Sequence, residues 1–211
     1  MANVSNVKAK FFGAVDETDP NGISTTASIS GAAALTINGT LTSGGSYTSG
    51  DNIGQLITIT SAGDDTGITF TVVGTNAVGD ALTEVVTGAD TAAASSSGYF
   101  NTVASITTSA STDAAVIAGV MGSSAAGAMG TGTVFAGRTR IRGLQGLSGT
   151  SAGNILFKNT SITGTTLLTV PTQAAAELIE SYIPDNAVLF DAGAYISVGS
   201  AVATVTVFYD G

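Results

Sequence analysis

Short runs of alternating apolar and polar residues fill most of the chain from residue 33 onward. In the run QLITIT, Ile57 and Ile59 point to one side of an extended backbone, and the Thr that follows each of them points to the other. Clusters of Gly, Asn, Asp or Ser separate such runs at about the 8 to 12 residue spacing of a β-sandwich or barrel. The predicted strands of this first group are Leu35–Leu41, Gln55–Ser61, Gly67–Val73, Ala81–Thr87, Tyr99–Ser109 and Ala114–Met121.

Two consecutive runs, GITFTVVG and ALTEVVTG, predict a β-hairpin in which the second run is the return strand. The connection Gly74–Asp80 is longer than a two-residue turn, and Gly79 is its predicted positive-φ residue. Thr and Val favour the pleated surface of a sheet, so the sequence predicts little helix.

A second group of strand-length runs extends from residue 133 to the C-terminus. One segment in this group, Gln173–Tyr182, also has apolar residues at helical spacing, so both helix and strand remain open there. Between the two groups, the run GSSAAGAMGTGT has no charge and is rich in Gly, which is typical of a linker.

These patterns predict an all-β protein of two small antiparallel β-sandwich or barrel-like domains. Residues 1–32 form an N-terminal arm and the first strands, and residues 33–121 form the first β-sandwich domain. Residues 122–132 are the Gly/Ala/Ser linker, and residues 133–211 are the C-terminal β domain. Whether the arm packs on its own domain or on a neighbouring protomer is left open by the pattern.

Charged residues make up only 10% of the chain, against about 25% in an average soluble domain. The net charge of -9 argues against non-specific binding to nucleic acid or to an anionic membrane. No stretch approaches 18 consecutive apolar residues, so no transmembrane helix is predicted. The six basic residues are unevenly distributed, because none lies between Lys10 and Arg138.

The pair Asp64 and Asp65, in the sequence SAGDDTG, is the first candidate site. Adjacent carboxylates beside Ser and Thr hydroxyls could bind Ca²⁺, which takes six to eight oxygen ligands. Asp is also a common turn residue between strands, and the spacing lacks the pattern of an EF-hand. The turn is therefore the preferred interpretation, and Ca²⁺ binding is kept as the alternative.

The composition leaves little room for catalysis. The chain has no His, Cys or Trp, and no basic residue stands near the carboxylate pairs Asp80 with Glu84 or Glu177 with Glu180 in the sequence. A glycosidase also needs aromatic side chains on which its substrate stacks. We therefore predict no enzymatic activity and no cofactor.

Arg138, Arg140 and Arg142 alternate along one predicted strand, so their guanidinium groups should form a single stripe. The stripe could bind phosphate or sugar, or it could mark a solvated edge strand whose charges discourage edge pairing. A third interpretation is contact with a carboxylate-rich surface of a neighbouring subunit, where Arg is favoured. The other candidate partner-contact residues are Lys8, Lys10, Phe11 and Phe12, in the N-terminal arm.

The run GQLITITSAGDDTGITFTVVGTNAVGDALTEVVTG, followed by SSGYFNTVASITTSAST, resembles structural proteins of tailed bacteriophages, particularly marine and cyanobacterial ones. The end of the chain resembles the same group, through ITGTTLLTVPTQ, IPDNAVLFDAGAYISVG and TVTVFYDG. The spans that contain these stretches, residues 54–112 and 162–211, together make up just over half of the chain. The pattern marks virion proteins in general and carries no catalytic residues.

The resemblance implies a non-enzymatic virion protein, and within that group we expect a capsid decoration, or cement, protein. Such a protein would be made in the host cytoplasm, would lie on the capsid exterior as a homotrimer, and would bridge subunits of the major capsid protein. The alternatives are a tail, fibre or adaptor component of the virion and a Ca²⁺-stabilised surface adhesin module. Copy number per particle separates the capsid role from the tail role.

Overall fold

The computed structural model describes residues 6–14, 18–50, 52–122, 129–183, 186–199 and 201–211. Within these ranges the chain consists of antiparallel strands and contains no helix. The all-β prediction is therefore confirmed. None of the described segments forms a helix that could cross a membrane.

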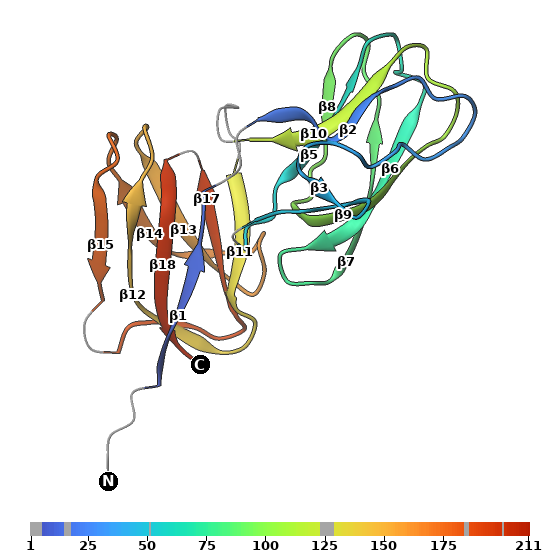
Figure 1. Cartoon of the computed structure of the whole chain (residues 1–211). Coiled ribbons are helices and arrows are strands. Elements are labelled where there is room, and N and C mark those ends of the chain that lie inside the picture. The colour runs from blue at the N-terminus through green and yellow to red at the C-terminus, as the bar shows by residue number, and fades with distance from the viewer. Residues whose placement is uncertain (1–5, 15–17, 51, 123–128, 184–185, 200) are drawn as a thin grey trace. The chain divides into compact units, whose positions relative to one another are not determined.

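The chain divides into two compact units (Figure 1). Unit 1 comprises Met1–Val15, Asp51–Ile53 and Met129–Gly211. Unit 2 comprises Asp16–Gly50 and Gly54–Ala128. The N-terminal segment is thus shared between the units and does not form a separate arm, because its first strand pairs within unit 1 and its second within unit 2.

Unit 1 is a sandwich of two antiparallel sheets, seen as two layers in Figure 1. The strands of the first sheet, in spatial order, are β1 (Val7–Phe12), β18 (Val202–Asp210), β12 (Thr139–Ser148) and β15 (Leu178–Tyr182), with β16 (Val188–Phe190) also paired to β12. The strands of the second sheet are β11 (Met129–Phe135), β17 (Ala194–Gly199), β13 (Gly153–Asn159) and β14 (Thr166–Thr172).

The core of unit 1 lies between these two sheets. In β18, alternate residues Val205 and Val207 are fully buried, and Ile141 in β12 and Phe157 in β13 pack into the same cluster. Phe12 in β1 also belongs to this cluster and has no exposed surface. The N-terminal strand is therefore part of this core, held there by burial of an aromatic side chain.

Unit 2 also contains two antiparallel sheets. The first consists of β2 (Asp19–Ala27), β10 (Val116–Met121), β5 (Leu56–Ser61) and β8 (Ala93–Ser95). The second consists of β3 (Thr42–Ser43), β4 (Ser46–Thr48), β9 (Phe100–Thr108), β6 (Thr69–Asn76) and β7 (Ala81–Thr87). Their inward-facing residues form one cluster that includes Ile57, Ile59, Phe70 and Ile106.

The strand β5 follows the predicted alternation only in part. Ile57 and Ile59 are fully buried as predicted, but Thr58, between them, is only 7% exposed. β5 is an interior strand of its sheet, with β10 on one side and β8 on the other, so side chains of both neighbouring strands flank Thr58. Thr is common in strands because it is β-branched, whether or not its side chain is exposed. A Thr in an alternating run is therefore not reliable evidence for an exposed position.

The predicted hairpin is confirmed as β6 and β7, with Thr75 opposite Ala81. Gly79 has a φ of 95°, as predicted for the turn. The Asn76 side-chain oxygen accepts hydrogen bonds from the amides of Val78 and Asp80 and so closes the loop. The connection is shorter than predicted because the ladder continues through Gly74 and Thr75.

The predicted strand Leu35–Leu41 is wrong. Its backbone bonds go to two different strands: the Leu35 amide donates to Ile106, and the Asn38 and Gly39 amides both donate to Ile23. Leu35 is nevertheless only 3% exposed. The alternating pattern therefore reflects alternate burial of side chains in a loop that crosses between two strands. Such alternation does not require that the segment pair with one strand along its whole length.

The structure decides between helix and strand at Gln173–Tyr182, and it describes part of the predicted linker. The segment Gln173–Tyr182 ends in the strand β15, and Ala175 and Ala176 have φ values of 82° and 55°, which a right-handed helix cannot contain. Of the predicted linker 122–132, residues 123–128 lie outside the described residues, and residues 129–132 belong to strand β11.

Candidate functional site: a basic groove on unit 1

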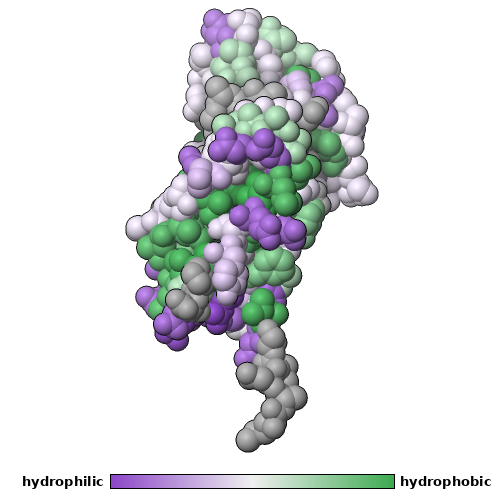
Figure 2. Space-filling model, turned by 90° about the vertical axis from the view of Figure 1, so that its left-hand side faces the viewer, coloured by the Kyte–Doolittle hydropathy of each residue, from purple (hydrophilic) through white to green (hydrophobic). Residues whose placement is uncertain are grey.

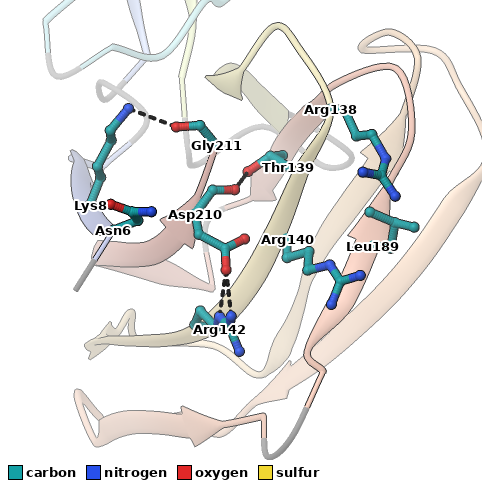
Figure 3. A pocket seen from close by; sticks show the side chains of 9 residues that line it. All are labelled: Asn6, Lys8, Arg138, Thr139, Arg140, Arg142, Leu189, Asp210 and Gly211. Atoms are coloured by element: carbon teal, nitrogen blue, oxygen red, sulfur yellow. Dashed lines mark hydrogen bonds and ion pairs between the residues drawn. The ribbon is translucent and has the colours of Figure 1, made fainter. Parts of the chain in front are cut away.

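The antiparallel order β1–β18–β12 brings the N-terminal strand, the C-terminal strand and the arginine-containing strand side by side. In this register Lys8 lies opposite Tyr209, and Arg140 lies opposite Asp210. A groove of about 570 Å³ opens at this end of the sheet (Figure 3). We call it the basic groove, because four of the chain's six cations line it: Lys8, Arg138, Arg140 and Arg142.

Arg142 and Asp210 form the tightest ion pair in the groove. Nε of Arg142 donates to Oδ2 of Asp210 at 2.8 Å, and Nη2 donates to the same oxygen. The side chains are 35% and 22% exposed, so the pair is partly shielded from solvent. The pairing of β12 with β18 is irregular between Ile141 and Gly143, which places Arg142 at a bulge.

Arg138 and Arg140 are held more loosely. Nε of Arg138 lies 3.7 Å from Oδ1 of Asp191, and both side chains are largely exposed, which makes this a weak pair. Nη1 of Arg140 donates to the backbone oxygen of Asn186 at 2.9 Å. Figure 3 shows both arginines beside Leu189, with Lys8 and Asp210 across the groove.

Lys8 forms the opposite wall of the groove. Its Nζ donates to the backbone oxygen of Gly211 at 2.7 Å and lies 5.6 Å from the ring centre of Phe135. That ring contacts the ring of Tyr209, with centroids 5.9 Å apart. An aromatic pair and a carbonyl therefore fix the ammonium group at the groove.

The remaining predicted contact residues do not line the groove. Lys10 is partly buried beside the ring of Phe12, and desolvation lowers the pKa of its ammonium group. Phe11 is 46% exposed, whereas Phe12 is completely buried in the core of unit 1. Phe12 is therefore not part of a surface, and its role in the fold is packing.

The sequence analysis missed an apolar surface beside the groove. Five of the exposed large hydrophobic residues lie on one face of the β1–β18–β12–β15 sheet, and we call this set the outer face: Val7, Phe11, Leu147, Leu178 and Tyr182. Figure 2 shows hydrophobic residues interspersed with polar ones on the side of the molecule where β15 lies. Exposed apolar residues that gather on one face indicate a contact surface.

A hollow of about 410 Å³ lies within this face. Gly143 lies opposite both Tyr182 and Phe208 in the register, and all three residues line the hollow. A Cβ atom at Gly143 would lie 2.6 Å from the Ser181 backbone oxygen, so glycine permits the close approach of β15 here. Arg142 lines both this hollow and the basic groove, so the two are continuous. Leu144 and Leu147 are three residues apart in the run GLQGLS, so in a strand they face opposite sides, and this spacing could have indicated that one Leu is exposed. The partner strands could not be known.

The Asp64–Asp65 pair lies in the connection between β5 and β6, as the turn interpretation predicts. Oδ1 of Asp64 accepts hydrogen bonds from the hydroxyl and the amide of Thr66, and these bonds lower the pKa of Asp64. Asp65 is fully buried and accepts a hydrogen bond from the Asp113 amide at 2.8 Å. Across the described ranges, no three acidic, His or Cys side chains are arranged to hold a metal ion.

In the other two carboxylate pairs, Asp80 with Glu84 and Glu177 with Glu180, the side chains differ in their contacts and exposure. Glu84 accepts bonds from the Ser97 amide and hydroxyl and from the Gly98 amide, at 2.6 to 2.8 Å. It therefore ties β7 to the loop that precedes β9. Asp80 and Glu180 are exposed, with Glu180 on the edge strand β15.

Comparison with models of known protein families, with curated proteins and with solved structures found no match.

Proposed function

We propose that this protein is a non-enzymatic virion structural protein that decorates a phage capsid and stabilises the major capsid protein shell. The observation that carries this proposal is the outer face of unit 1, where exposed apolar residues adjoin four cations. Aromatic residues and Arg are the side chains that dominate protein–protein contacts. The resemblance of the middle of the chain and of its C-terminal part to phage structural proteins supports a virion as the place of that contact.

The physical properties of the surface suit repeated, modest contacts. Tyr182 is 80% exposed and Leu178 is 65% exposed, so burial of both in an interface would remove much apolar area from water. The contact is repeated at each symmetry-related position of a shell. A protein that bridges neighbouring subunits also binds more tightly, because its first contact raises the effective concentration for its second. The net charge of -9 disfavours binding to the packaged genome.

A binding experiment with phage heads prepared without this protein tests the proposal. The purified chain should bind to the heads with a copy number comparable to that of the major capsid protein, and should raise their resistance to heat. Binding at a few copies per particle would instead support the tail, fibre or adaptor role. No binding to heads, together with a loss of thermal stability on adding a chelator, would support the adhesin role.

A matched pair of variants tests whether the outer face makes the contact. Leu178→Ser should weaken head binding by about tenfold or more, since full burial of a Leu side chain contributes roughly 1.5–3 kcal/mol. Leu167→Ser is the control, because Leu167 is 45% exposed but lies in β14 of the other sheet. Equal binding by the two variants would show that the outer face is not the capsid contact.

A further inference from the structure

The two units differ in charge, because unit 1 has no net charge and unit 2 is strongly acidic. All six Lys and Arg residues lie in unit 1, and unit 2 has none. In unit 1 the acidic residues equal the basic ones in number, so the net charge of -9 belongs to unit 2. Two copies of the chain therefore have complementary surfaces, cationic on one unit and anionic on the other.

The basic groove has donors left for an incoming anion. Among the described residues, the groove is lined by four cations and by one carboxylate, Asp210, which is engaged by Arg142. Arg140 contacts only a backbone oxygen through Nη1 in the described residues, and Arg138 has one long, exposed pair. Each guanidinium group has five N–H donors in a planar arrangement that suits carboxylates, so Arg138 and Arg140 can both take a further partner.

Unit 2 presents three exposed aspartates together, which we call the acidic cap: Asp64, Asp90 and Asp113. They lie on three different connections between strands. Asp64 forms a backbone bridge with Asp90, and its amide donates to Oδ2 of Asp113. The hydrogen bonds from Thr66 keep the pKa of Asp64 low, so this carboxylate is charged at neutral pH.

We propose that the basic groove of one copy binds the acidic cap of a second copy. Charge complementarity within one chain supports this partner: unit 2 has no cation that could offset the cap internally, and unit 1 concentrates its cations in one groove. The contact is heterologous, because the two surfaces differ. Each copy has one groove and one cap, so repeated contacts generate a closed ring or an open chain.

This inference goes beyond capsid binding, because the contact needs no shell. Exposed ion pairs are individually weak and are screened by salt, so the association is expected to be concentration-dependent and to require low ionic strength in dilute solution. On a shell that holds neighbouring copies close together, the same contact would be strengthened by effective concentration.

Sedimentation velocity of the purified full chain tests the proposal without capsids. Self-association should be visible at about 0.01 M salt, where the Debye length is about 30 Å, and should disappear near 1 M salt, where it is about 3 Å. A chain that stays monomeric at all concentrations in low salt would overturn the proposal.

Charge reversals at the two surfaces locate the contact. Arg140→Glu should weaken self-association by about tenfold, as should Asp90→Lys. Lys158→Glu and Asp80→Lys are the matched controls, since they change the net charge equally and lie outside the groove and the cap. Equal effects of control and test variants would show a general effect of charge and contradict a specific contact.

A mixing experiment separates loss of the contact from loss of folding. The Arg140→Glu variant keeps its acidic cap, and the Asp90→Lys variant keeps its basic groove. If both variants are folded but do not self-associate, an equimolar mixture of the two should therefore form a heterodimer. The heterodimer should not grow further, because its remaining groove and cap carry the substitutions. A mixture that stays monomeric, while both variants unfold at the temperature of their controls, would also overturn the proposal.

Discussion

The carboxylates of the two units have different kinds of hydrogen-bond and ion-pair partners. In unit 2, which lacks Lys and Arg, acidic side chains accept hydrogen bonds from backbone amides and hydroxyls: Glu84 from Ser97 and Gly98, and Asp65 from Asp113. In unit 1, Asp210 pairs with Arg142 and Asp191 with Arg138. A β-sandwich can therefore accommodate acidic residues with or without cations, provided that donors are available.

The difference has consequences for stability and for contacts. Bonds from fixed backbone amides lose little strength in salt, whereas the exposed pair of Arg138 and Asp191 is screened. Unit 2 has no Lys or Arg to pair with its acidic residues, so the exposed ones give it a negative surface. Unit 1 uses part of its positive charge internally and presents the rest in the basic groove.

The largest expected effect in this comparison is at Glu84. Glu84→Ala removes the acceptor of three bonds from Ser97 and Gly98, and should lower the free energy of unfolding by about 2–3 kcal/mol. Chemical denaturation measures this change. Glu84→Gln keeps one side-chain oxygen as an acceptor and should lose less; a Glu84→Ala variant as stable as the unmodified protein would contradict a role for the carboxylate.

Asp65 should show the next largest effect. Asp65→Ala leaves the Asp113 amide without its acceptor beside a fully buried site, and should lower the free energy of unfolding by about 1–2 kcal/mol. Asp65→Asn keeps an acceptor for that amide and is the control. Hydrogen exchange of the Asp113 amide should accelerate in the Ala variant but change little in the Asn variant.

A smaller effect is expected at the ion pair of unit 1. Arg142→Ala should lower the free energy of unfolding by about 1 kcal/mol, because the pair with Asp210 is only partly shielded. Arg138→Ala should change stability by less than half of that, since its pair is longer and more exposed. The Arg142 effect should shrink in high salt, while the Glu84 effect should not; the reverse order would contradict the comparison.

The smallest expected effect is the titration of Asp64. Its folded-state pKa lies below the unfolded value of about 3.9, so its stabilising contribution is present above that pH and is lost as the pH falls through the folded pKa. Thr66→Val removes the larger cause, the side-chain hydrogen bond, and should raise the pKa of Asp64 toward its usual value. Carboxyl NMR titration measures it, with Thr40→Val, beside Asp19, as a control that should leave Asp64 unchanged.

Much of the strand content could be predicted from local pattern. The strand Ala81–Thr87 has the predicted boundaries, and its hairpin turn contains the predicted positive-φ glycine, Gly79. The predicted strand Leu35–Leu41 was wrong. Its alternation reflects the burial of Leu35, while the backbone hydrogen bonds of this loop divide between two strands. Local periodicity indicates which side chains are buried, but it does not identify the hydrogen-bond partner.

The candidate site could be predicted only in part. The spacing of Arg138, Arg140 and Arg142 placed three cations together, and they do line one groove. Lys8 could not be assigned to that groove, because it arrives through the pairing of β1 with β18 across almost the whole chain. The hollow lined by Gly143, Tyr182 and Phe208 could not be predicted either, because the three residues come from three strands that the register brings together.

The sequence by itself determined the all-β class, the strand-forming runs, the absence of Lys and Arg between Lys10 and Arg138 and the acidic character of that segment. These properties depend on side-chain chemistry and on the spacing of residues along the chain, both of which can be read directly from the sequence. The tertiary structure alone decided that the first strand joins the last one, that Phe12 is buried while Phe11 is exposed, and that the two ends form one basic groove. Strand pairing is made by backbone groups that are nearly the same at every residue, so its long-range partners emerge only when the whole core is packed.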